Sequence, residues 1–435
     1  MRATCCNLSP MLGIHTKQCW YLSLALVLAA ASPLRADDWP NWRGPNHNGI
    51  STESNWLARW LPEGPLPLWK TSVGLGFSSV AVCKGRAYTM GNQKDTDTVF
   101  CFDAETGKLL WKQSYPCPTD PHFYEGGTSA TPTVEGNSVF TLSKRGDLFC
   151  FAADDGKIVW SKNIAKELSL ETPLWGFASS ALIEGQLLLL NVGSFGAAFD
   201  KSSGKVVWST GTNASGYSTP VPCSFGGKPA LALMTSTGAA GVDMATGATL
   251  WQYLLKADYK INVADPVPAG DCLFISSMYA KSGALLQIAD GTAKAVWQNG
   301  NMRNQINSSV LVDGFLYGVD GRAGPAPDAG LKCVEWQTGA VQWTYPGLGG
   351  GALMVADGKI IALSDKGELF TAAVSPQSFT PISRAQVLGG RCWTVPVLAN
   401  GRLYCRNAQG DLVCLDVKPL ESIKRDVQRT AVKPY

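Results

Sequence analysis

Short apolar segments alternate with polar turns from about residue 66 to residue 417. In the recurring unit, an apolar strand is followed by a turn of the form Asp-x-x-Thr/Ser-Gly-Lys, then by two apolar residues and a tryptophan. Residues 103–111 show the full pattern, and residues 154–160 and 200–208 are close copies. Because Asp bonds to backbone two residues on and Gly adopts the positive φ of a tight turn, each unit predicts a β-hairpin.

The tryptophans of this pattern set the period of the repeat. They are Trp69, Trp111, Trp160, Trp208, Trp251, Trp297 and Trp343, and neighbouring members are 42 to 49 residues apart. That spacing is typical of the four-stranded blades of a β-propeller. We expect each tryptophan to lie on an outer strand, where its large ring can cover the seam between two blades.

A second pattern gives the number of blades. A strand of small residues, a glycine turn and another apolar strand occur together eight times, the first strands starting near Ser78, Ser129, Ala178, Ser218, Val263, Ser308, Ala352 and Thr394. The turns are marked by Gly85, Gly136, Gly185, Gly227, Gly270, Gly314, Gly358 and Gly401. Small side chains suit innermost strands that crowd around an axis. We therefore predict an all-β, eight-bladed propeller of four-stranded antiparallel blades, with a seven-bladed ring as the alternative.

The two ends of the repeat region complement each other. The last unit, residues 394–417, stops before its tryptophan strand, whereas residues 66–70 form a tryptophan strand without the rest of a unit. If the N-terminal strand completes the last blade, the ring closes and no open sheet edge remains. The seventh unit is degenerate, because Ser and Pro replace its Asp-x-x-Thr-Gly turn, and its outer strand is expected near Phe379. Residues 66–417 thus form the propeller.

Residues 1–36 have the pattern of a secretory signal peptide. Arg2 and Lys17 precede an apolar run at residues 19–31, and small residues allow cleavage after Ala36 or Ala31. The run is shorter than the roughly 20 residues that span a bilayer, and no later stretch is apolar enough to do so. We expect export to the periplasm or the extracellular space as a monomer; an uncleaved anchor is the alternative.

Two further segments flank the propeller. Residues 37–65 do not follow the repeat and are rich in tryptophan; we expect them to pack along the outside of the ring, with a partner-binding arm as the alternative. Residues 418–435 form a charged tail that is expected to fray.

Charge and cysteine content narrow the function. The chain has 37 Lys and Arg against 34 Asp and Glu, and all three charges of the leader are basic, so the remainder is neutral. Without basic clusters, nucleic acid is not an expected partner. Ten of the 13 cysteines follow the leader, and Cys101, Cys150, Cys333 and Cys414 occupy one repeat position that Ala198 and Gly241 fill elsewhere. We expect buried thiols there. A Cys405–Cys414 disulfide across a hairpin is the alternative.

These repeats resemble the pyrroloquinoline-quinone (PQQ) enzyme repeat, a propeller blade with a tryptophan-docking motif. The chain is similar over residues 66–417 to PQQ-binding-like propeller repeat proteins, a group that includes quinoprotein alcohol dehydrogenases and the outer-membrane assembly factor BamB. Residues 38–46 are similar to a segment of many exported bacterial members. In the quinoproteins, the resemblance implies a funnel that holds PQQ with Arg and Trp, coupled to Ca²⁺ through Glu, Asn and Asp, with an Asp as base.

Candidate site residues cluster in the loops that precede the innermost strands, which meet at one mouth of the axial funnel. They include the segment 122–125 and are Tyr124, Glu125, Trp175, Tyr217, Asn262, Asp265, Arg303, Asn304, Asn307, Arg391 and Trp393. Polar groups beside aromatic walls suit a small-molecule or peptide site. The alternative is that these side chains tie adjacent blades together or plug the channel.

Two function classes follow. The first is a non-catalytic exported scaffold that binds a protein, peptide or glycan, with no cofactor and with a role in cell-envelope assembly by analogy with BamB. It is favoured because histidine is rare, no nucleotide, zinc-protease or hydrolase motif occurs, and no adjacent cysteine pair follows the leader. The alternative is a PQQ-dependent alcohol or sugar dehydrogenase in which Asp265 is the candidate base.

Overall fold

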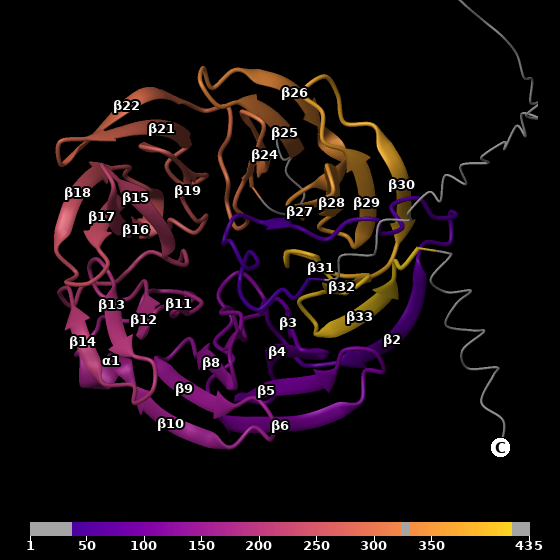
Figure 1. Cartoon of the computed structure of the whole chain (residues 1–435), viewed down its shortest axis with the longest axis horizontal. Helices are drawn as coiled ribbons and strands as arrows, with labels where there is room; N and C mark the ends of the chain where they lie inside the picture. Colours follow the sequence, from indigo (N-terminus) through magenta and orange to yellow (C-terminus); the bar gives the residue numbers. More distant parts are fainter. Residues whose placement is uncertain (1–36, 323–329, 420–435) are drawn as a thin grey trace, which may run out of the picture. The chain divides into compact units, whose positions relative to one another are not determined.

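The computed structural model describes residues 37–322 and 330–419, so the predicted signal peptide and most of the predicted tail lie outside the described residues. Within them, eight antiparallel sheets follow one another around a ring (Figure 1). Each sheet runs from an innermost strand beside the axis to an outermost strand at the rim. The predicted eight-bladed propeller is confirmed.

The first four blades use consecutive strands. Blade 1 is β3 (Ala81–Cys83), β4 (Arg86–Asn92), β5 (Thr96–Asp103) and β6 (Leu109–Pro116). Blade 2 is β7 (Thr133–Glu135), β8 (Ser138–Leu142), β9 (Asp147–Ala152) and β10 (Ile158–Asn163), followed by helix α1 (Ile164–Glu167). Blade 3 is β11 (Leu182–Glu184), β12 (Leu187–Leu190), β13 (Ala197–Asp200) and β14 (Val206–Ser209). Blade 4 is β15 (Val221–Phe225), β16 (Lys228–Thr235), β17 (Gly238–Asp243) and β18 (Thr249–Leu254), followed by η1 (Asp258–Lys260).

The last four blades include the two strands of the N-terminal region. Blade 5 is β19 (Val267–Ala269), β20 (Cys272–Ser277), β21 (Ser282–Ala289) and β22 (Thr292–Asn299). Blade 6 is β23 (Val310–Val312), β24 (Phe315–Asp320), β25 (Gly330–Glu335) and β26 (Val341–Tyr345), followed by η2 (Pro346–Leu348). Blade 7 is β27 (Ala352–Ala356), β28 (Lys359–Leu363), β29 (Glu368–Ala373) and β30 (Pro381–Gln386), to which β1 (Ile50–Ser51) adds in parallel. Blade 8 is β31 (Val397–Ala399), β32 (Arg402–Arg406), β33 (Asp411–Asp416) and β2 (Leu66–Ser72).

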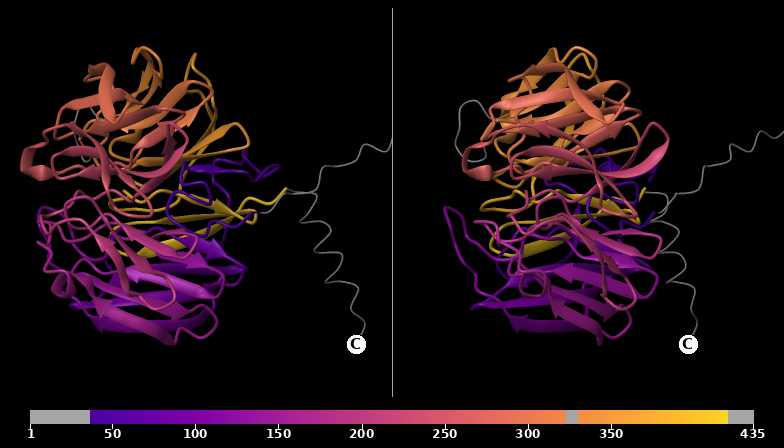
Figure 2. Two further views of the ribbon diagram at one scale, coloured as in Figure 1. Left: turned by 60° about the vertical axis from the view of Figure 1, so that its left-hand side comes forward. Right: turned by 90° about the vertical axis from the view of Figure 1, so that its left-hand side faces the viewer.

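The ring closes where the sequence predicts. Strand β2 pairs antiparallel with β33, with Trp69 opposite Cys414 and Ser72 opposite Asp411. Arg406 then joins blade 8 to blade 1: its buried guanidinium donates to the backbone oxygens of Ser78 (2.8 Å) and Met90 (2.7 Å). The side views show the first and last blades next to each other (Figure 2). One shared sheet and one buried cation therefore both contribute to closure.

The repeat tryptophans dock on the following blade, as expected. Six of the seven indole N–H groups donate to a backbone oxygen there: Trp69 to Ala104 (3.2 Å), Trp111 to Ala153 (2.8 Å), Trp160 to Lys201 (3.0 Å), Trp208 to Met244 (3.1 Å), Trp297 to Trp336 (2.8 Å) and Trp343 to Ser375 (2.9 Å). Gly156 has φ +73°, and a Cβ atom there would come within 2.6 Å of the Trp111 ring. The turn glycine is thus required both for its backbone angle and for the tryptophan that lies on it.

Trp251 is the exception. Its indole nitrogen is buried and has no hydrogen-bond partner among the described residues. Blade 5 replaces the long turn with a two-residue turn at Asp290 and Gly291, since Ala289 pairs directly with Thr292. The shorter turn does not present the carbonyl that the other blades offer.

The repeat cysteines fill the narrow space beside the tryptophans. Cys101 is fully buried, pairs with Tyr88 on one strand and with Trp111 on the next, and the other three repeat cysteines have the same kind of neighbours. All ten described cysteines are free. Cys405 pairs with Val413, so Cys405 and Cys414 lie on opposite faces of the sheet. The alternative disulfide is therefore wrong.

The innermost strands begin up to four residues later than expected, because the preceding residues form a hydrogen-bonded girdle. Two residues before its strand, each of several blades offers a side-chain oxygen to a backbone N–H of the blade before it. The chain of bonds runs from Ser79 to Thr131 (3.0 Å), Ser180 (2.9 Å), Thr219 (3.1 Å), Asp265 (2.8 Å) and Ser308 (2.8 Å). The small residues of the pattern thus serve blade-to-blade bonding near the axis.

The predicted course of residues 37–65 is wrong for its first half. Residues 39–51 cross the central channel: Trp39 exchanges two backbone bonds of 2.8 Å with Val82, and Arg43 donates to the Ser309 oxygen at 2.8 Å. The segment runs across the centre of the ring in Figure 1. The short innermost side chains leave a channel that this segment fills. Residues 57–60 then lie over blades 7 and 8, where Trp60 bonds to Ser383.

The segment carries a buried acid, Glu53. Its carboxylate accepts a bond from the Gly401 backbone, and burial raises the pKa of Glu53 to about 7. The folded state therefore holds a proton that the unfolded chain releases near pH 4.5. Stability must then fall as the pH rises from about 4.5 through 7.

We expect Glu53→Gln to weaken this pH dependence, because glutamine keeps an acceptor without a charge. The melting temperature of the native protein should fall between pH 5 and pH 8, and that of Glu53→Gln should fall less. Glu63→Gln, at an exposed position of the same segment, is the control. If the melting temperatures of all three proteins change equally with pH, the pH dependence does not come from Glu53.

The tryptophan docking gives a second prediction. Trp111→Phe loses a buried hydrogen bond and Trp251→Phe loses none, so the first should cost about 1 kcal/mol more stability than the second. Denaturant unfolding measures the difference. Equal losses for the two variants would show that the indole bond does not stabilise the seam.

Candidate functional site

A cavity of about 980 Å³ lies at one mouth of the channel. Its walls come from the loops that precede the innermost strands, as the sequence predicts. The residue four positions before the strand lines it in seven of the eight blades: Phe77, Ser129, Ala178, Tyr217, Val263, Ile306 and Trp393. We call this cavity the funnel.

The predicted site residues divide into two groups. Seven line the funnel: Tyr124, Trp175, Tyr217, Asp265, Asn307, Arg391 and Trp393. The other four, Glu125, Asn262, Arg303 and Asn304, do not. Asn262 and Asn304 donate to backbone oxygens inside the ring, and Arg303 pairs with buried Asp320 at 2.8 Å. Asn262 thus ties blade 5 to blade 4, as the alternative expects, whereas Arg303 and Asn304 bond to β24 of blade 6, the blade that their loop enters.

Arg391 is fixed on two sides. Its guanidinium lies over the Trp393 ring, 4.4 Å from the ring centroid, and Nη1 donates to Glu125 at 2.6 Å. Trp393 also stacks with Phe77, with centroids 5.5 Å apart and ring planes 25° apart. Glu125 also accepts from Gln409 at 3.2 Å. This cluster pairs the charge of Arg391 with an internal carboxylate.

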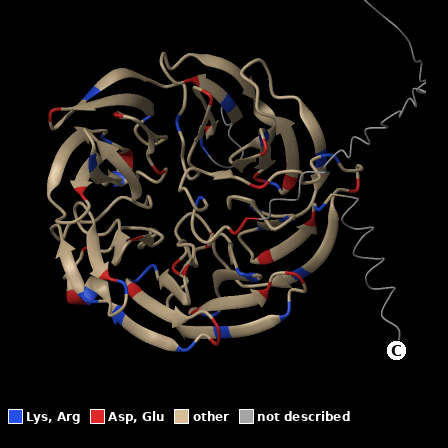
Figure 3. Cartoon of the chain, in the orientation of Figure 1, with Lys and Arg blue, Asp and Glu red and all other residues tan. Residues whose placement is uncertain are grey.

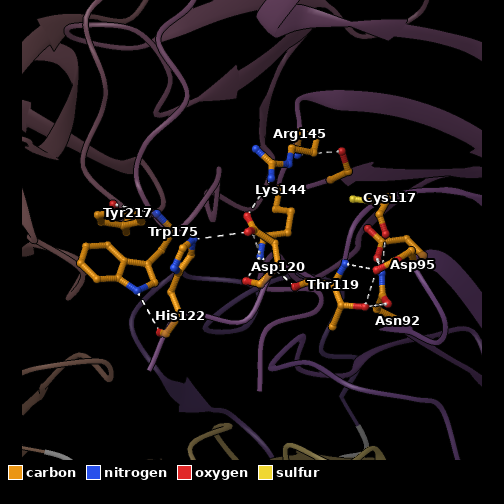
Figure 4. A network of polar contacts seen from close by, with 12 residues as sticks. Asn92, Asp95, Cys117, Thr119, Asp120, His122, Lys144, Arg145, Trp175 and Tyr217 are labelled. Carbon is orange, nitrogen blue, oxygen red and sulfur yellow. Dashed lines mark hydrogen bonds and ion pairs between the residues drawn. The ribbon is translucent and has the colours of Figure 1, made fainter. Parts of the chain in front are cut away.

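The segment between β6 and β7 forms much of the rim and is held by Asp120. Asp120 lies among His122, Lys144 and Arg145 (Figure 4), with nitrogen–oxygen distances of 3.3, 3.7 and 2.8 Å. Burial lowers the pKa of Lys144, which also donates to the Asp120 backbone oxygen at 3.2 Å. The His122 backbone oxygen accepts from the Trp175 indole at 3.3 Å. The rim segment is thus held by Lys144 and Arg145 of blade 2, and it is joined to the loop that carries Trp175.

Two aromatic rim residues adopt backbone angles that are rare for bulky side chains. Phe123 has φ 61° and is 99% exposed, and Tyr259 has φ 57° and is 75% exposed. Both line the funnel. Large apolar side chains held outward at a cavity mouth are a feature of binding surfaces.

Asp265 lies deeper, in the girdle. One oxygen accepts from the Thr219 backbone at 2.8 Å, and the other accepts from the Trp42 indole at 2.6 Å and lies 3.9 Å from Arg43. Burial raises the pKa of Asp265, and Arg43 opposes this rise. Both oxygens of the candidate base are therefore engaged within the protein.

Comparisons with known proteins place the chain. A family model described as outer membrane protein assembly factor BamB, of the PQQ-like repeat type, matches residues 95–345. The chain belongs to this family. The recognition of PQQ-like propeller repeats is confirmed. A comparison with curated proteins finds no match.

Solved structures share the fold. BamB from Moraxella catarrhalis is 17% identical with a TM-score of 0.58, covering 80% of this chain and 100% of that chain. Quinohemoprotein alcohol dehydrogenase from Comamonas testosteroni is 11% identical with a TM-score of 0.64, covering 88% of this chain and 80% of that chain. At these identities the likeness concerns the fold alone.

The residues of this BamB-family funnel do not fit a calcium-coupled PQQ site. The candidate site residues of the types that bind calcium in the quinoproteins are each engaged elsewhere: Glu125 with Arg391, Asn262 with Thr235, and Asp265 with Trp42. Across residues 37–322 and 330–419, no group of three or more His, Cys, Asp or Glu could hold a metal. Arg43 beside Asp265 also opposes a second cation there.

Sequence reasoning missed part of the funnel. Phe77 occupies the same position before its strand as Tyr217 and Trp393, so the repeat register could have found it. Trp42 comes from the N-terminal segment, and Tyr279 follows β20, the second strand of blade 5. Neither lies in a loop before an innermost strand, so the sequence pattern could not predict them.

This geometry predicts that calcium and PQQ leave the protein unchanged. Mixing the protein with both should shift neither its melting temperature nor the absorption spectrum of the quinone. A calcium-dependent shift of either quantity would contradict the interpretation and favour the dehydrogenase.

Proposed function

We propose that this protein is an exported, non-catalytic propeller that binds a peptide or glycan in its funnel. The carrying observation is a wide, aromatic-walled cavity in which two charged lining residues are paired within the protein: Arg391 with Glu125, and Asp265 with Arg43. Such a cavity favours ligands that offer apolar faces rather than a strong net charge. Trp, Tyr and Arg, which supply nine of its 24 lining residues, are the residue types that contribute most at binding interfaces.

Two lines support the wider role. The apolar leader with its small-residue cleavage positions supports export. The family description, outer membrane protein assembly factor, supports a role in the cell envelope and a protein partner. No helix within residues 37–322 or 330–419 is long and apolar enough to cross a membrane. Acidic and basic residues are interspersed around the ring (Figure 3).

Catalysis finds less support in the funnel. The described residues include two histidines, of which His47 lies outside the funnel wall and His122 pairs with Asp120. The candidate base Asp265 is committed to three groups of the protein. A general base needs an oxygen within reach of the substrate proton.

The test is a thermal-shift screen with two panels: neutral oligosaccharides of four to six units, and unstructured peptides that contain aromatic residues. We expect at least one panel to raise the melting temperature, and Trp175→Ala to abolish the shift because Trp175 lines the funnel. Tyr253→Ala, on outermost strand β18 away from the funnel, should retain it. No shift with either panel, or shifts that survive Trp175→Ala, would contradict the proposal. Dye-linked alcohol oxidation by the protein would favour the dehydrogenase.

A further inference from the structure

The N-terminal segment contributes one residue to the funnel. Of the described residues 37–65, Trp42 is the member that lines it. On either side of Trp42 the segment is bound to the ring: the Pro40 oxygen accepts from Val134 at 2.8 Å, and β1 pairs with β27. The segment therefore crosses the channel below the funnel and places an indole at its lower end. We call Trp42 the floor.

Asp265 departs from the pattern of the girdle. The equivalent positions in neighbouring blades are Ser180, Thr219 and Ser308, whose single hydroxyl oxygen accepts the backbone N–H of the preceding blade. A carboxylate performs the same task with one oxygen and has a second oxygen to spare. That second oxygen receives the Trp42 indole at 2.6 Å. The acid is needed where the girdle meets the segment, and a hydroxyl suffices elsewhere.

Arg43 stabilises the charge of this acid. Its side chain is 6% exposed, and Nη2 donates to the Ser309 oxygen at 2.8 Å and the Asn48 oxygen at 3.1 Å. Nε donates to the His47 oxygen at 3.3 Å and lies 3.9 Å from Asp265. Arg43 thus closes the segment into a compact loop and supplies the positive charge that a buried carboxylate requires.

We propose that Trp42 is a ligand-contacting residue, the floor of the funnel, and that Asp265 is the residue that positions it. The channel is then closed on that side, and a bound ligand ends against the indole. Asp265 acts as a latch between the ring and its own N-terminal segment. Contact with a ligand rests on the proposed function, whereas the latch does not and can be tested without any ligand.

The variants follow from counting acceptors. Asp265→Ser keeps the girdle bond to Thr219 and loses the bond to Trp42. Asp265→Asn keeps the shape, but its single oxygen can serve only one of the two donors, and its amide faces the other. Ser180→Ala is the matched control, because it removes the girdle bond from Thr131, two blades away from Asp265.

The primary readout is the indole N–H signal of Trp42 in a ¹⁵N-labelled sample, identified as the cross-peak that Trp42→Phe lacks. We expect it to lose its carboxylate-bonded position in Asp265→Ser and Asp265→Asn, while the other indole signals stay in place and report that the ring is folded. In Ser180→Ala the Trp42 signal should not move. A Trp42 signal unchanged in both Asp265 variants would overturn the latch.

Trypsin provides a second readout, because cleavage after buried Arg43 requires the segment to leave the channel. Loss of a charge-assisted bond should increase this cleavage about tenfold in Asp265→Ser, with Ser180→Ala close to the native rate. Equal rates in Asp265→Ser and the native protein would overturn the proposal. If both readouts agree but no ligand is found in the screens, the latch stands and the proposed function fails.

Discussion

The structure depends on closing eight sheets around one axis, beside which the residues before the innermost strands are mostly small. Neighbouring blades must bond to each other near the axis, and the seam between them must be covered at the rim. The girdle through Thr131, Ser180 and Thr219 meets the first demand, and the repeat tryptophans meet the second. Position in the repeat therefore fixes which residues face the channel, and the loops just before the girdle form the funnel.

The same constraint separates what the sequence could predict from what it could not. The blade number, the tryptophan seams and the closure by β2 follow from patterns that recur, because each blade solves the same packing problem. The predicted starts of the innermost strands are too early, because the small residues before them bond to the neighbouring blade and do not pair within a sheet. Seven of the eleven predicted site residues line the funnel, because a loop before an innermost strand lies at the mouth of the channel. Asn262 and Arg303 lie in such loops too, but their side chains bond to Thr235 and Asp320 within the ring.

The N-terminal segment lay beyond prediction because it occurs once. Nothing repeats against which Trp42 or Arg43 could be aligned, and tryptophan-rich segments pack against many surfaces. In hindsight one signal existed: Asp265 stands where its neighbours carry Ser or Thr. The charged funnel residues Asp265 and Arg391, which a catalytic site would use, are thus bonded to other residues of the protein. This fold is shared with dehydrogenases and with BamB. Here it carries aromatic residues around the funnel and a carboxylate, Asp265, whose two oxygens are both hydrogen-bonded within the protein.

A crystal structure with the tightest-binding oligosaccharide or peptide would test this account most directly. It predicts a ligand within the funnel, between the Trp175 and Arg391 sides and ending on Trp42, with the Trp42–Asp265 bond intact. A ligand on the outer edges of the blades would contradict it. So would a ligand deep in the channel that has displaced Trp42 and bonded to Asp265.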